Sequence, residues 1–233
     1  MWKNIEYKNW RILFKSDESK MTPFNHNHLD YYSFILIYKD KIILTDSGGS
    51  SYDSKLKDTD ARLPEYHNSI KIMNLGYKPA NSRYFTKNYI DCKFKTTVNK
   101  NANHIEIKLM STGFNRIDNK INLTRLIKIF DSMIIVEDRS FSNKIYPIEH
   151  YFHFPMESTI KQSNNNLHME SEGNLLNISY DENSRHIEIN KNKFLRYYSE
   201  QYNQPGLKNY IKIFSSISLS KPIIHKFEIQ KNG

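Results

Sequence analysis

The sequence has a single cysteine, Cys92, among its 233 residues, so no disulfide bond within the chain is possible. A lone thiol neither requires nor excludes an oxidising compartment. No apolar run approaches the ~18 residues of a membrane-spanning helix, and no membrane span is expected. The first residues, Met1-Trp2-Lys3, lack the pattern of a signal peptide. The chain is therefore either cytoplasmic or begins downstream of an export signal.

Acidic residues are fewer than basic ones, 25 against 34, which gives a formal net charge of +9. A basic surface favours polyanionic partners such as nucleic acid, anionic lipid or acidic glycans. The lysines are scattered and form no dense cluster, so charge alone does not choose among these partners. No recognised nucleic-acid-binding motif is present, and nucleic acid is not expected as a partner.

Long amphipathic helices are also missing from the pattern. Short segments instead alternate apolar and polar residues, as at Ile105, Ile107 and Leu109, which is typical of strands with one buried face. So many short strands indicate an antiparallel sandwich or barrel, and we expect an all-β, antiparallel multi-stranded β-sandwich forming a single domain over residues 1–233. The predicted strands are 10–15, 32–38, 41–46, 68–73, 92–98, 104–109, 123–130, 133–138, 150–154, 175–180, 186–189, 194–200, 210–217 and 223–229.

Four residues in the first third of the chain stand out as a candidate site: His26, His28, Asp46 and His67. The two neighbouring histidines precede a predicted hairpin that turns at Lys39-Asp40. Asp46 ends the second strand of that hairpin, so the turn returns it to the start of the first strand. His67 opens the next strand, after a polar stretch at 47–66 that can bring the chain back to the same end.

Two imidazoles and one carboxylate at the rim of a sheet suit zinc, with a fourth position open to water or substrate. Asp30 or Asn68 could orient a ligand histidine. Simpler interpretations stay open, because H-x-H recurs by chance in a chain with nine histidines. The stretch Asp46-Ser47-Gly48-Gly49 also fits a turn that its carboxylate caps. A second pair, His150 and His153, falls on opposite faces of a strand and fits sheet packing or the surface.

The order of these motifs resembles the C-terminal domain of the heparinase II/III-like family, which includes alginate and heparin or heparan lyases. The matching residues cover roughly 24–73, and the stretch 134–139 also has the look of the family's strands. They read His26-x-His28-x-Asp30-x-x-Ser33-Phe34, then the apolar hairpin, then Asp46-Ser47-Gly48, Tyr52, Arg62 and His67-Asn68.

The resemblance implies a zinc ion bound by His28, Asp46 and His67, with His26 among the catalytic groups. It also implies Arg62 and Asn68 as substrate-binding residues. The family cleaves uronic-acid polysaccharides by β-elimination, in which a proton leaves C5 and the C4–O bond breaks. The charge that develops needs hydrogen bonds or cations to stabilise it. An acidic, uronate-containing polysaccharide is therefore the implied partner, and a periplasmic or secreted location is implied as well.

In the family, the tyrosine that acts as base and acid belongs to an α/α-toroid domain that precedes the sandwich. None of the 16 tyrosines of this sequence stands in a matching context. We therefore expect the chain to be incomplete as a catalyst by itself, and to have a toroid-domain partner or to self-associate through an exposed apolar face. The alternative is a non-catalytic, zinc-stabilised module that binds glycan or assembles surface polysaccharide.

A cupin-type metal oxygenase or isomerase also uses H-x-H on a β-fold. That motif has a glutamate further along after its second histidine, whereas His28 is followed by Leu29, Asp30 and Tyr31. Asp30 is too close to His28 to take the place of that glutamate. The cupin interpretation is therefore the weaker one.

Overall fold

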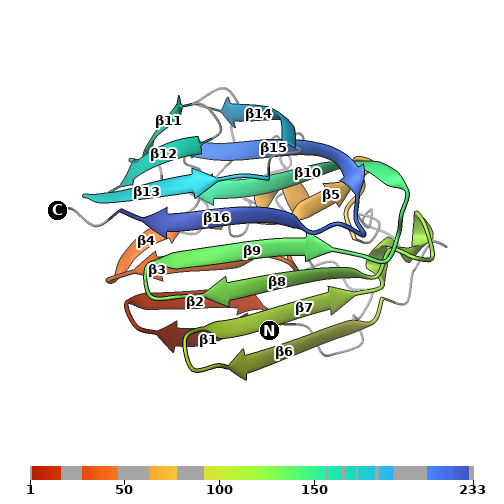
Figure 1. The fold of residues 1–233 in the computed structure, drawn as a ribbon, viewed down its shortest axis with the longest axis horizontal. Helices are drawn as coiled ribbons and strands as arrows, with labels where there is room; N and C mark the ends of the chain where they lie inside the picture. Colours follow the sequence, from red (N-terminus) through yellow and green to blue (C-terminus); the bar gives the residue numbers. More distant parts are fainter. Residues whose placement is uncertain are drawn as a thin grey trace, which may run out of the picture.

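The computed structural model describes residues 2–16, 28–46, 63–77, 92–155, 157–163, 166–171, 173–181, 184–190 and 209–230. Within them, every strand pairing is antiparallel, and the strands stack in two layers (Figure 1). The predicted all-β sandwich is therefore confirmed. The helices in this part are two short 3-10 turns, η1 (Pro64–Tyr66) and η2 (Gly113–Arg116). No helix among the described residues is both long and apolar enough to cross a membrane.

The front layer in Figure 1 is one eight-stranded sheet with the order β11-β12-β13-β16-β9-β8-β7-β6. Residues along β7 alternate between buried and partly exposed, so one face of this sheet packs on the core and the other faces solvent. Its strands are β6 (Phe94–Lys100), β7 (Ile105–Ser111), β8 (Leu123–Ile129), β9 (Met133–Arg139), β11 (Thr159–Ser163), β12 (Asn166–Ser171), β13 (Asn174–Ser179) and β16 (Ile223–Ile229).

The back layer consists of two four-stranded sheets, ordered β1-β2-β3-β4 and β14-β15-β10-β5. Their edges meet where the Thr45 amide donates to the His153 carbonyl at 3.0 Å. Residues just after β4 therefore lie beside β10. The strands are β1 (Trp2–Tyr7), β2 (Trp10–Lys15), β3 (Phe34–Tyr38), β4 (Lys41–Leu44), β5 (Ile70–Ile72), β10 (Ile145–Phe154), β14 (Ser184–Asn190) and β15 (Asn209–Ser218).

The facing sides of the two layers enclose the hydrophobic core. Phe152 of the back layer and Phe227 of the front layer have ring centroids 5.0 Å apart. The indole N–H of Trp10 donates to the Asp131 carbonyl at 3.0 Å, so its polar atom is also satisfied across the layers. Fully burying a large apolar side chain contributes about 1.5–3 kcal/mol. The inward-facing positions therefore hold the layers together.

The predicted hairpin is confirmed, with β3 and β4 joined at Lys39 and Asp40. These two residues have φ angles of 47° and 62°, as a two-residue type I′ turn requires. The turn sends β4 back along β3. As a result, the Ser33 hydroxyl, just before β3, donates to Asp46 Oδ2, just after β4, at 2.7 Å.

Most other predicted strands are present, with several differences. Strands β1 and β11 were not predicted, because they bury few side chains. Strand β12 was also missed, because the alternation of its buried Leu167 and Met169 extends over only two apolar residues. Strand β10 begins at Ile145 rather than at residue 150, with Pro147 inside it. The carbonyl of Pro147 accepts from the Met73 amide at 2.8 Å, so part of its backbone still bonds to a neighbour. The predicted strand 194–200 lies outside the described residues.

Candidate functional site

Asp46 and His67 meet at the point where the back-layer sheets join. The Nδ1 atom of His67 lies 3.0 Å from Oδ1 and 3.1 Å from Oδ2 of Asp46. Asp46 follows β4, and His67 follows η1 and leads into β5, so the two residues lie near the start and the end of the β4–β5 connection. Both side chains are buried. The sequence prediction that these two residues converge therefore agrees with the structure.

His28 lies beside this pair. Its ring centroid is 5.3 Å from that of His67, with the ring planes tilted by 49°. Burial, followed by the nearby His67, lowers the pKa of His28, against the opposing effect of Asp30 and Asp46. The hydroxyl of Tyr77 donates to the His28 carbonyl at 3.2 Å and so fixes the backbone there. The lowered pKa favours the neutral imidazole of His28, the form that can bind a metal ion.

These three side chains are neighbours, but they are not arranged around one metal position. The Asp46 carboxylate is bonded to both His67 and Ser33. Among the residues that the structure describes, no group of three or more His, Cys, Asp or Glu side chains is arranged to hold a metal ion. The donor types nevertheless fit zinc, since two imidazoles and a carboxylate form one of its ligand sets in catalytic sites.

Asn68 joins the segments that carry the site. Its side-chain amide donates to the carbonyls of Phe34 at 2.6 Å and Thr45 at 2.7 Å. Its oxygen accepts from the His153 amide at 2.7 Å. The residue is fully buried. Asn68 therefore ties β3, the end of β4 and β10 together directly behind Asp46 and His67, and its predicted contact with substrate stays a prediction.

Two predicted site residues, His26 and Arg62, lie outside the described residues.

Asp30, which the sequence suggested as a residue that orients a ligand histidine, lies near His28. Its carboxylate is almost fully buried, with Oδ2 lying 3.4 Å from Lys15 Nζ. As a nearby negative charge, Asp30 partly offsets the lowering of the His28 pKa, so it acts on the site electrostatically.

A buried ionic cluster under the site was not predicted from the sequence. Arg125 on β8 pairs with Asp138 on β9, and its Nη1 donates to the carbonyls of Tyr32 at 2.9 Å and Asn68 at 2.8 Å. Arg125 thereby fixes, from the front sheet, the two segments that flank Ser33 and His67. The sequence does contain one signal for this cluster. Strand alternation places Arg125 and Asp138 on the same inward faces as their apolar neighbours.

Two histidines complete this cluster. The Nε2 of His150 lies 3.1 Å from Asp138 Oδ2, and the ring centroid of His225 is 4.5 Å from that of His150. Burial raises the pKa of Asp138, but the Arg125 charge and the hydrogen bonds of His150 and Arg125 outweigh it and hold the pKa well below its usual range. Burial lowers the pKa of both histidines. The expectation that His150 serves packing agrees with this placement.

The fold is similar to those of solved polysaccharide lyases. Heparan sulfate lyase HepC from Pedobacter heparinus superposes with a TM-score of 0.70 at 14% identity, covering 96% of this chain and 33% of that one. A heparinase III gives 0.68 at 14% identity, covering 98% and 34%. A putative mutarotase (YeaD) from Salmonella typhimurium gives 0.52 at 8% identity, covering 99% and 94%. The chain thus spans about a third of the length of the heparinase chains that it matches.

No curated protein matches the sequence. The profile of the family described as "Heparinase II/III-like, C-terminal" matches residues 2–211, which is most of the chain. This match agrees with the motif order around His28, Asp46 and His67. The chain therefore belongs to the heparinase II/III-like C-terminal domain family.

Proposed function

We propose that this chain is the metal-binding β-sandwich part of a lyase that cleaves uronic-acid polysaccharides by β-elimination. The observation that carries the proposal is the adjacency of His28, from the β2–β3 connection, to Asp46 and His67, from the two ends of the β4–β5 connection. Zinc is the proposed ion, with these three side chains as its ligands. A bound zinc ion would add positive charge near the substrate and hold the β2–β3 and β4–β5 connections together.

The remaining proposed roles follow from the chemistry of the reaction. A base removes the C5 proton, the electron pair forms a C4=C5 double bond, the C4–O bond breaks, and an acid protonates the departing oxygen. We propose His26 as one of the catalytic groups, and Arg62 as the cation that pairs with the uronate carboxylate. For Asn68 the hydrogen bonds to three backbone segments favour a positioning role. The tyrosine base is proposed to come from a helical domain, in the same protein or in a partner.

The lyase proposal is tested with uronate polysaccharides such as alginate and heparan sulfate. The chain, combined with the helical domain of a heparinase relative, is expected to produce ultraviolet absorbance from the new C4=C5 bond. The His26→Ala variant is expected to lose this signal, while His104→Ala, a histidine of the β6–β7 connection, keeps it. Zinc-loaded protein that gives no product with any uronate glycan in this assay contradicts the lyase function.

The second candidate is a non-catalytic, zinc-stabilised module that binds glycan or assembles surface polysaccharide. The observation that favours it is the burial of Asp46 and His67, because a closed site suits a structural zinc ion better than one open to substrate. Binding of uronate glycans without turnover, even with the helical domain supplied, would distinguish this module from a lyase. Binding is followed by calorimetry and turnover by absorbance on the same protein.

A further inference from the structure

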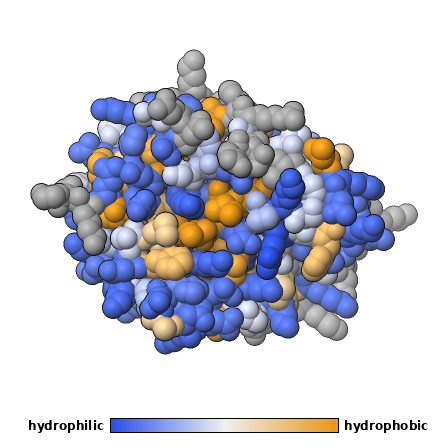
Figure 2. All heavy atoms as spheres, viewed as in Figure 1, coloured by the Kyte–Doolittle hydropathy of each residue, from blue (hydrophilic) through white to orange (hydrophobic). Residues whose placement is uncertain are grey.

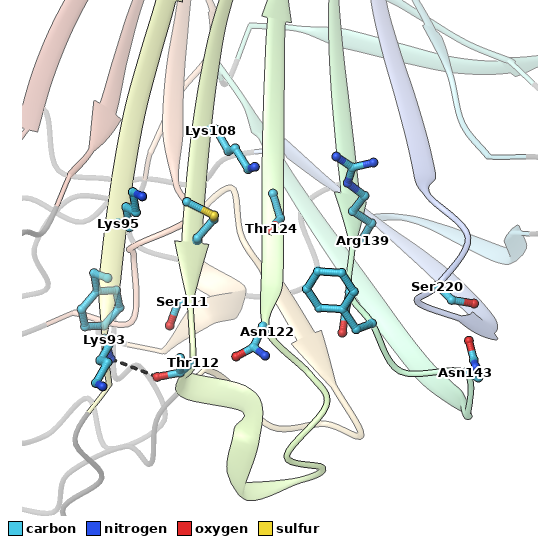
Figure 3. A pocket seen from close by; sticks show the side chains of 14 residues that line it. Lys93, Lys95, Lys108, Ser111, Thr112, Asn122, Thr124, Arg139, Asn143 and Ser220 are labelled. Atoms are coloured by element: carbon cyan, nitrogen blue, oxygen red, sulfur yellow. Dashed lines mark hydrogen bonds between the residues drawn. The ribbon is translucent and has the colours of Figure 1, made fainter.

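A hollow of about 680 Å³ opens on the outer face of the front sheet, where β6, β7, β8 and β9 approach the loops after β9 and β15. Figure 3 shows Lys93 and Lys95 on one side, Arg139 on the other, and Thr124 between them. The site around Asp46 and His67 belongs to the back layer, so the front sheet lies between the two. This hollow is within the size range of small-molecule and oligosaccharide sites.

The charge of the hollow is positive. Four cations line it, Lys93, Lys95, Lys108 and Arg139, and no Asp or Glu is among its lining residues. Within the described residues, no carboxylate oxygen lies within 4.0 Å of the three lysines. Arg139 has a weak partner, with its Nε 3.7 Å from Glu137 and its side chain 51% exposed. Unneutralised cations around a concave surface concentrate their field inside it and attract anions.

The uncharged lining favours a sugar chain over other anions. Phe141 lines the hollow with 78% of its surface exposed, so its ring is available to pack against a ligand. Hydroxyl and amide groups, including those of Thr124 and Asn122, lie between the cations. Figure 2 shows that this face mixes hydrophilic and apolar side chains rather than forming one apolar surface. A flat aromatic ring beside hydroxyls and cations matches a pyranose that carries carboxylate or sulfate groups.

We propose that this hollow is a binding site for an acidic oligosaccharide, separate from the candidate metal site. The anionic groups pair with Lys95 and Lys108, and a sugar ring packs on Phe141. Nucleic acid fits less well, because single strands are held by several stacked aromatic platforms, whereas this hollow offers one exposed ring. The inference does not rest on the proposed metal site or on lyase activity. It assigns a second glycan contact to the opposite face of the sandwich.

The test uses a fluorescein-labelled heparin octasaccharide, with binding followed by fluorescence anisotropy in buffer containing a metal chelator. The double variant K95E/K108E is expected to weaken binding about tenfold or more, since it removes two hydrogen-bonding cations and puts repelling carboxylates in their place. The matched control K100E/K226E makes the same change in net charge at two exposed lysines of the same sheet that do not line the hollow. It is expected to bind nearly as tightly as wild type.

Two further variants separate the sugar contact and the metal site. Phe141→Ala is expected to bind several-fold more weakly, and the exposed ring can be removed without harming the fold. Because the chelator removes zinc, the result does not depend on the metal site, and His104→Ala, which lies outside both sites, is expected to bind like wild type. Failure here and failure of the proposed function are therefore distinguishable. Three results would each overturn the proposal: no binding by wild type, equal weakening by the control pair, or equally tight binding of a single-stranded DNA of matched charge that Phe141→Ala leaves unchanged.

Discussion

Arg125 Nη2 lies 2.7 Å from Asp138 Oδ2, and neither side chain has any exposed surface. The pair is bidentate, because Nε also donates to Oδ1 at 2.9 Å. The remaining nitrogen, Nη1, reaches the carbonyls of Tyr32 and Asn68 in the back layer. One buried ion pair in the front sheet thus holds the backbone next to Ser33 and next to His67.

Breaking this pair is expected to destabilise the protein strongly. Asp138→Asn leaves the Arg125 charge buried without compensation, which typically costs about 3–5 kcal/mol of unfolding free energy. The matched control is Asp40→Asn, because Asp40 pairs with Arg11 at 3.2 Å while the two side chains are 95% and 40% exposed. Its cost is expected to be at most about 1 kcal/mol. Urea unfolding measures both, and a similar small loss in the two variants would contradict the assigned role.

The two buried histidines predict that stability falls in mild acid. Neither ring nitrogen of His225 has a hydrogen-bond partner among the described residues, and burial followed by the nearby His150 holds its pKa well below normal. As the pH falls below ~6.5, these histidines bind protons in the unfolded chain but stay neutral in the folded chain. Stability is therefore full above that pH and is lost below it, by about 1.4 kcal/mol per pH unit for each such histidine.

The variant His225→Leu tests this contribution. It replaces the imidazole with a side chain of similar volume, so at pH 8 its unfolding free energy is expected to stay within about 1.5 kcal/mol of wild type. Between pH 6.5 and 5 it is expected to lose less stability than wild type. Urea unfolding at several pH values gives both curves, and parallel curves would refute the contribution of His225.

Asn68 is expected to act through structure. Asn68→Ala removes bonds to Phe34, Thr45 and His153, and leaves two carbonyls and one amide buried without them. Each lost partner costs about 1–3 kcal/mol, so a large drop in thermal stability is expected. The control Asn177→Ala removes one half-buried contact to His168 on β12 and is expected to cost far less. Unchanged stability with weaker glycan binding would instead support the substrate contact predicted from the sequence.

Local patterns predicted much of the fold and part of the site. The alternation on both sides of Lys39-Asp40 specified a hairpin, and the hairpin specified where Asp46 returns, so its contact with Ser33 followed from spacing alone. The position of His67 could be anticipated only through the family resemblance, because it depends on the connection at 47–66. Strand β1 was not predicted, because its side chains are mostly exposed and its sequence shows little apolar periodicity.

The buried ionic cluster could not be found from one sequence. Strand alternation places Arg125 on the same inward face as Leu123 and Ile127, but it does not show which residue neutralises the buried charge. Asp138 neutralises Arg125 from the adjacent strand, and His150 reaches the same carboxylate from the opposite layer. Such a cluster is stable only when all its members meet, which depends on tertiary packing.

The most direct test of the central claim is the metal content of the purified protein after incubation with zinc, measured by elemental analysis for wild type, His28→Ala and His104→Ala. The account predicts about one zinc ion per chain in wild type and in His104→Ala, and its loss in His28→Ala. Zinc absent from all three proteins, or retained equally in His28→Ala, would contradict a metal site at His28, Asp46 and His67.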